Sequence, residues 1–163
     1  MYFNFFIKKL KICSVNKLID IFIIKLKMER ISYEFNNKIR FPQGSVNKTI
    51  FSTTGYKKVT CIGSGFEKEA IAKLNIPAGS TIVRSNLSVG ELRTDQVLVE
   101  KIKDLDGEII NEDDYQCTGY IYYGVKYKTG EITKPSESLD INVNRLCVPG
   151  IHFYLTKKEA ENC

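Results

Sequence analysis

Apolar and polar residues alternate along much of the chain after residue 49, and this period of two predicts β-strands. Successive side chains of a strand point to opposite faces, so one face packs on a core while the other meets solvent. Glycine- or proline-bearing turns separate the alternating runs at 63–65, 77–79 and 104–107. The pattern predicts a β-rich core with strands at Lys57–Ile62, Ala70–Ile76, Ser80–Arg84, Val97–Lys103, Tyr120–Lys128 and Ile151–Leu155.

A short helix is predicted at the C-terminus. Thr156 is followed three residues later by Glu159, the spacing of a capping box, in which the threonine hydroxyl accepts a backbone N–H and the glutamate bonds back to the N-cap. Few residues remain before Cys163, so packing must hold this helix. The expected fold class is therefore α+β, a single domain of mostly antiparallel β-sheet with a short C-terminal helix.

The first part of the chain has a different character. A length of 163 residues suits one domain, and we predict an apolar and basic N-terminal extension over 1–44, helical or disordered, before a globular domain over 45–163. Residues 1–27 are apolar but interrupted by lysines, so no run is long enough to span a bilayer. Three interpretations stay open for residues 1–27: a dispensable extension with Met28 as a second start, a basic amphipathic helix on a membrane surface, and a packed helix.

The net charge of +5 is carried by residues 1–27. Residues 1–27 carry six lysines and one acid, Asp20, whereas residues 28–163 carry 18 basic and 18 acidic residues. Nucleic-acid-binding domains cluster cations on one face of the folded part. The neutral body therefore argues against a nucleic-acid partner.

The cysteines suggest a reducing compartment. There are five, an odd number, without regular spacing, which favours free thiols. We therefore expect an intracellular, cytoplasmic protein.

Three stretches are similar to a known family: Gly55–Lys58, Ile71–Ala78 and Cys147–Ala160. They resemble a domain family of unknown function that occurs in giant viruses and phages, often beside pentapeptide repeats. Its most recognisable part is the closing Cys-x-x-Gly-Ile-His-Phe segment, here 147–153, after a Tyr-x-x-Gly…Pro stretch like the one at 127–135. The resemblance implies a viral or phage source and a common fold, and it implies no activity.

Two positions depart from the family pattern. Leu92 stands where members tend to carry a cysteine just before the arginine at position 93, and Tyr154 replaces a usual phenylalanine. A role for that cysteine therefore does not transfer to this chain.

Candidate chemistry centres on His152, the single histidine, which follows Cys147 across the turn at 149–150. An imidazole within reach of a thiol can make it a nucleophile, so an enzyme built on Cys147 and His152 is one hypothesis, although no partner to orient the ring is identifiable. The competing interpretation is structural, with Cys147 as a small buried apolar residue and His152 as a fixed hydrogen-bonding residue on a strand. A zinc site through these residues lacks the paired Cys-x-x-Cys of structural sites, so we expect neither metal nor cofactor.

A further hypothesis is that the strand face carrying His152 binds a ligand without catalysing a reaction. In this hypothesis, Arg84, Arg93 or Arg145 meets the polar face carrying His152 and forms a pocket for an anionic ligand, because a guanidinium donates in pairs. The alternative is that these arginines pair with surface acids. The expected function is that of a small viral or phage accessory protein, a non-enzymatic binding domain for a partner protein or a small anionic ligand. The alternatives are the Cys147/His152 enzyme and a membrane-surface protein acting through residues 1–27.

Overall fold

The computed structural model describes residues 40–119 and 124–163, and residues 41–163 form one compact unit. The elements in chain order are β1 (Ser45–Lys48), β2 (Thr53–Ile62), β3 (Glu67–Ile76), β4 (Thr81–Arg84), β5 (Leu92–Thr94), β6 (Val97–Asp104), β7 (Gln116–Gly119), β8 (Lys126–Tyr127), β9 (Ile132–Thr133), β10 (Ile151–Phe153) and α2 (Lys157–Glu161). The predicted antiparallel β-sheet with a short C-terminal helix is confirmed, and the described part is nearly all β.

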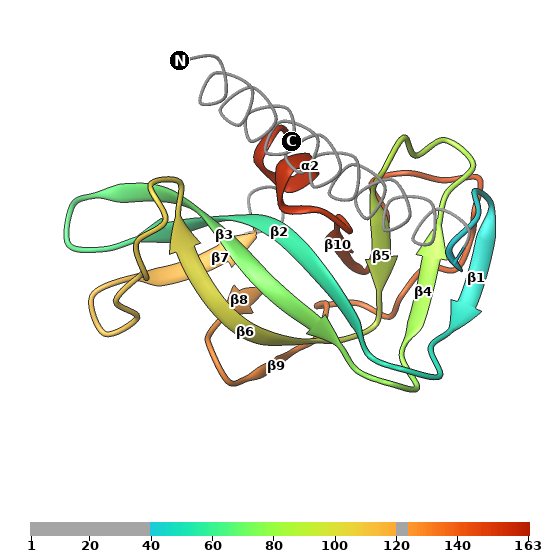
Figure 1. Ribbon diagram of the computed structural model, residues 1–163, viewed down its shortest axis with the longest axis horizontal. Coiled ribbons are helices and arrows are strands. Elements are labelled where there is room, and N and C mark those ends of the chain that lie inside the picture. Colours follow the sequence, from blue (N-terminus) through green and yellow to red (C-terminus); the bar gives the residue numbers. More distant parts are fainter. Residues whose placement is uncertain (1–39, 120–123) are drawn as a thin grey trace, which may run out of the picture. The chain divides into compact units, whose positions relative to one another are not determined.

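The strands in the described ranges form two antiparallel sheets (Figure 1). The larger sheet has the order β8-β7-β2-β3-β6-β9, and the smaller has the order β1-β4-β5-β10. The long β2–β3 hairpin is the centre of the larger sheet, paired from Thr53 opposite Ile76 to Ile62 opposite Glu67.

A single apolar core receives side chains from both sheets. Buried residues of one cluster come from the larger sheet and from the smaller one, among them Val59, Leu74, Val99, Ile102, Ile82, Leu92, Ile151 and Phe153. Burial of apolar surface on this scale is the main favourable contribution to folding.

A β-bulge interrupts the alternation in β6. Lys73 lies opposite Lys101 but Leu74 lies opposite Val99, so Glu100 is an extra residue on β6. The bulge places Val99 and Ile102 in the core although they are three residues apart.

The long predicted strands are found close to their expected bounds, with one exception. The prediction of a single strand over 120–128 is wrong for the described residues of that range. β7 ends at Gly119, residue 124 lies in a turn and β8 begins only at Lys126. Glycine at position 124 favours a turn over a continuous strand. Residues 120–123 lie outside the described residues.

The predicted capping box is present at α2. The Thr156 hydroxyl accepts from the backbone N–H of Glu159 at 3.3 Å, and the Glu159 carboxylate accepts from the backbone N–H of Thr156 at 3.2 Å. Ala160 is fully buried, so packing holds this short helix as well.

The interpretations of residues 1–27 fall outside the described part of the chain. Within residues 40–119 and 124–163 we find no helix with the length and apolar character needed to cross a membrane.

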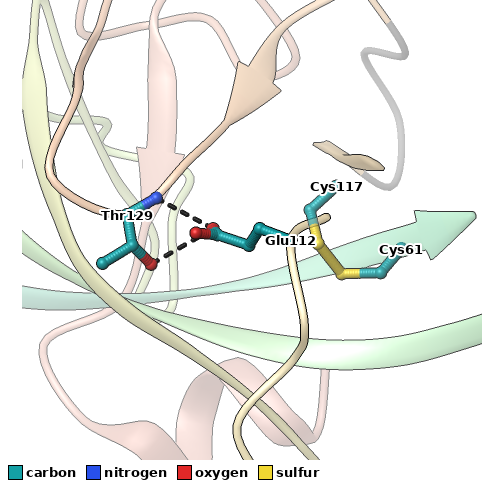
Figure 2. Close-up of a disulfide and its surroundings, with 4 residues drawn as sticks. All are labelled: Cys61, Glu112, Cys117 and Thr129. Carbon is teal, nitrogen blue, oxygen red and sulfur yellow. Dashed lines mark hydrogen bonds between the residues drawn. A yellow bond between two sulfur atoms is a disulfide. The ribbon is translucent and has the colours of Figure 1, made fainter. Parts of the chain in front are cut away.

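The prediction that all cysteines are free thiols is wrong for Cys61 and Cys117, which form a disulfide between β2 and β7 (Figure 2). The two residues are direct register partners, with Cα atoms 3.9 Å apart. Nearby, Glu112 accepts hydrogen bonds from the backbone N–H and the hydroxyl of Thr129, at 2.8 and 3.1 Å. Cys61 and Cys117 therefore give no support for a reducing compartment.

Candidate functional site

Two of the stretches that carry the family resemblance meet where the two sheets join. Directly after β10, Tyr154 exchanges two backbone hydrogen bonds with Tyr56 of β2, both 2.8 Å long. Gly55 lies under the ring of Phe153, because a Cβ at position 55 would be 2.5 Å from Phe153 Cδ2. The segment 147–160 thus joins the smaller sheet to the larger one.

Both ring nitrogens of His152 are hydrogen-bonded inside the protein. Nδ1 lies 2.9 Å from a carboxylate oxygen of Glu91, and Nε2 lies 2.8 Å from the carbonyl oxygen of Val148. Both ring nitrogens of His152 are therefore engaged by groups of the fold, a carboxylate and a backbone carbonyl.

The Glu91 carboxylate is the charged partner of this ring. Burial raises the pKa of Glu91, but the hydrogen bond to His152 and the positive charges of His152, Lys57 and Arg93 outweigh it, so the pKa lies below its ordinary value. Glu91 is therefore ionised at neutral pH and bonded to a predominantly buried histidine.

Arg93 lies opposite His152 in the sheet and is 2% exposed. Its guanidinium donates to three backbone carbonyls of one loop: Asp140 at 2.8 Å, Asn142 at 2.5 Å and Arg145 at 3.2 Å. Such charge-assisted bonds are stronger than neutral ones. Arg93 therefore fixes the loop over 139–150 to the smaller sheet.

Gly150 permits this close packing. Its φ is +141°, a value that side chains rarely adopt, and a Cβ there would lie 2.7 Å from Leu139 Cδ1 and 3.2 Å from Arg93 Cβ. The glycine of the Cys-x-x-Gly segment is thus explained by backbone geometry.

The structure separates Arg84 from Arg93 and His152. Arg84 follows Val83, the register partner of Arg93, so its side chain leaves the opposite face of the sheet. One of its terminal nitrogens donates to the Phe41 carbonyl at 2.9 Å. The three arginines predicted to meet His152 do not converge on one pocket with it.

Arg145 and Cys147 lie at the surface of the loop. The Arg145 side chain is 63% exposed and bonds to Asp140 Oδ2 at 3.3 Å. Cys147 is exposed with a φ of +50°, so the interpretation of Cys147 as a buried apolar residue is wrong. It sits in the irregular loop before β10, where no strand carries it into the core.

A different cluster stands out on the outer face of the larger sheet. A hollow of about 280 Å³ is lined by Tyr56, Ile71, Lys73, Lys101, Lys103 and Lys157. The register explains it, because residues opposite one another share a face: Tyr56 lies opposite Lys73, which lies opposite Lys101, and Ile71 lies opposite Lys103. Lys157 comes from α2, which contacts β2 and β3. We call this cluster the lysine hollow.

The four lysines of the hollow differ in whether a neighbouring carboxylate balances their positive charge. Lys73 bonds to Glu100 at 2.5 Å, which raises the pKa of Lys73, and Lys157 pairs with Glu161 at 2.9 Å. Lys103 donates to the carbonyl of Gly107 at 2.9 Å, which leaves its charge unopposed. The Lys101 side chain is exposed and makes no hydrogen bond or ion pair with any described residue.

Counting charges along the sequence missed this cluster. The lysines of the hollow come from two strands and from α2, which are far apart in the sequence. No continuous run of basic residues therefore indicates the cluster. The one local signal is the Lys-Ile-Lys pattern at 101–103, in which the buried isoleucine sends both lysines to the other face.

Comparisons with known proteins place the chain among viral sequences. The model of a family of unknown function, DUF5758, matches residues 37–160. The chain is 34% identical to the uncharacterized protein L796 of Acanthamoeba polyphaga mimivirus over 132 residues, which cover 80% of this chain and 87% of the relative. It is also 34% identical to the uncharacterized protein L223 of the same virus over 120 residues, 71% of this chain and 76% of the relative. No solved structure matches significantly. The predicted resemblance to a giant-virus family of unknown function is confirmed.

Proposed function

We propose, from the premise that this chain belongs to the DUF5758 family of unknown function, that it is a non-enzymatic binding domain whose ligand is a small phosphate-bearing molecule. The observation that carries the proposal is the lysine hollow, where four lysines from three elements surround one concave site. Ammonium groups bind phosphate as point charges, and charge-assisted hydrogen bonds are the strong ones.

The size and lining of the hollow favour a small molecule. Its volume of about 280 Å³ is close to the lower end of ordinary ligand pockets. Tyr56 and Ile71 add an aromatic and an apolar surface beside the lysines, and an aromatic ring can stack on a base or a sugar. A phosphorylated sugar or a nucleotide combines these features.

The carboxylates around the hollow argue against a long polyanion. Glu100 and Glu161 bond to Lys73 and Lys157, so a nucleic-acid backbone crossing the hollow would meet negative charge as well as positive. The unopposed charges of Lys101 and Lys103 lie on one strand, two residues apart. The positive charge that attracts a ligand is therefore confined to a small area, which suits a small anion.

The contacts of His152 and Arg93 support binding rather than the Cys147/His152 enzyme. The His152 ring is bonded to Glu91 and to the Val148 carbonyl, and the Arg93 guanidinium is bonded to three backbone carbonyls. The proposal places the protein in the cytoplasm of an infected cell. The alternative is a membrane-surface role of residues 1–27, which lie outside the described residues.

Calorimetric titration with inorganic tripolyphosphate tests the proposal. We expect Lys101→Ala/Lys103→Ala to weaken binding by about tenfold or more, because two charge-assisted contacts are lost. The matched control is Lys126→Ala/Lys128→Ala, an exposed pair with the same spacing outside the hollow, which should change affinity less than about twofold.

Two results would contradict the proposal. Equal weakening by both double variants would show a general charge effect. Binding of single-stranded RNA with a steep salt dependence, without binding of tripolyphosphate, would show a nucleic-acid surface instead.

A further inference from the structure

Lys57 occupies a core-facing position of β2. Gly55, Val59 and Cys61 lie on the same face of that strand and are buried, and the register partner of Lys57 is the fully buried Ala72. Lys57 itself is half-buried, and lysine is among the residues least often found inside a protein. Its place on this face therefore calls for a physical explanation beyond surface charge.

The amine of Lys57 has few partners for a group in this position. Its Nζ donates to the His152 carbonyl at 3.0 Å and lies 5.9 Å from the centre of the Tyr127 ring. A charged amine has three N–H donors, and the described residues supply this one hydrogen-bond acceptor. The contact explains how Lys57 helps to join β2 to β10, and it leaves the nitrogen able to bond to something else.

A small cavity adjoins the amine. Its volume is about 60 Å³, and it is lined by Lys57, the buried Tyr127, the exposed Ser136 and Glu137, and Gly150 of the closing segment, among others. The volume holds a few water molecules or an organic molecule of a few non-hydrogen atoms. Because Ser136 and Glu137 are exposed, the cavity borders on solvent.

The surroundings also favour the uncharged amine. Burial lowers the pKa of Lys57 to about 8, although the charges of Glu91 and Cys163 act in the opposite direction. At pH 7 about a tenth of the Lys57 amines are then uncharged, compared with about 0.03% of ordinary lysines. An uncharged lysine amine is the nucleophile of Schiff-base chemistry.

We propose that Lys57 forms a reversible imine with a small aldehyde or ketone that enters this cavity. The amine nitrogen attacks the carbonyl carbon, and proton transfer from nitrogen to oxygen gives a carbinolamine. The C–O bond then breaks, the oxygen leaves as water with both hydrogens of the amine, and a C=N bond remains. No oxidant or reductant is needed. Tyr127 lines the same cavity, and burial raises the pKa of its phenol, so its hydroxyl stays protonated at neutral pH.

Reductive trapping of the imine in the wild-type protein tests this directly. Acetaldehyde and sodium cyanoborohydride at pH 7 convert an imine into an N-ethyl lysine, which peptide mapping by mass spectrometry locates. We expect Lys57 to be ethylated at least about tenfold faster than Lys101, the exposed reference lysine in the same sample. In urea the two lysines should react alike, because the preference depends on the fold.

The pH dependence supplies a second readout. The preference for Lys57 should fall as the pH rises from 7 to 10, because the uncharged fraction of an ordinary lysine rises several hundredfold over that range, whereas that of Lys57 rises only about tenfold. Lys57→Arg should remove the fastest-forming adduct and leave Lys101 reactive. Ethylation of Lys57 no faster than that of Lys101 at pH 7 would overturn the proposal. It would leave the lysine hollow untouched, since tripolyphosphate binding is measured without aldehyde and does not involve Lys57.

Discussion

Arg93→Met is expected to destabilise the domain by about 3–5 kcal/mol, because three charge-assisted hydrogen bonds to the loop over 139–150 are lost at once. Methionine retains an unbranched side chain, so the guanidinium is the group that the change removes. The carbonyls of Asp140, Asn142 and Arg145 lose a donor from a residue that is 2% exposed. Urea unfolding followed by circular dichroism measures the change in the free energy of unfolding.

The matched control is Arg145→Met, which removes the same charge from the surface of the same loop. Arg145 makes an exposed ion pair with Asp140, and such pairs contribute about 0–1 kcal/mol. Equal destabilisation by the two variants would contradict the role assigned to Arg93.

Reduction of the Cys61–Cys117 disulfide is expected to lower the free energy of unfolding by about 4 kcal/mol. The bond closes a loop between residues 56 apart in sequence, and on the chain-entropy account a loop of this length restricts the unfolded chain by about that amount. The measurement is urea unfolding with and without a phosphine reductant. Both arms use a Cys13→Ser/Cys147→Ser/Cys163→Ser background, which removes every cysteine outside the disulfide. Cys147 and Cys163, the free thiols of the described residues, are exposed and can exchange with the disulfide.

Alkylation checks the premise of this prediction. In the unfolded, unreduced protein, iodoacetamide should leave Cys61 and Cys117 unmodified. Modification of both, or identical unfolding midpoints in the two arms, would contradict the assignment of a stabilising disulfide.

The sequence predicts the long strands well because they carry enough alternating positions. Runs such as 57–62 and 70–76 repeat the pattern several times, and β2 and β3 are found there. β9 has two residues and β5 has three, too few for an alternation of apolar and polar residues to be recognised. These strands are defined by their pairing with β6 and β4. The bulge at Glu100 cannot be predicted from the neighbouring sequence either, because it is defined by the register with the partner strand β3.

Contacts between distant residues are what the sequence could not supply. Cys61 and Cys117 are partners because β2 and β7 adopt one particular register, and spacing along the chain does not reveal it. The same limit applies to His152: the sequence predicts a hydrogen-bonding residue on a strand, and only the fold identifies its partners Glu91 and Val148.

The closing segment of the family resemblance has a structural explanation. Gly150 allows the loop to pack on Arg93, His152 anchors Val148, and Phe153 lies over Gly55. A recognisable motif of this kind identifies the fold of the family without marking a site of chemistry. The candidate sites of this chain, the lysine hollow and the Lys57 cavity, are formed mainly by other residues.

The most direct test of the binding proposal is an NMR titration of the isotopically labelled protein with inorganic tripolyphosphate. We predict that the largest amide shift changes occur along β3 and β6 near Lys73, Lys101 and Lys103, and at the start of α2. Changes concentrated in the loop over 139–150 and around His152 would contradict the account, because they would place the anion site at the arginines and histidine instead.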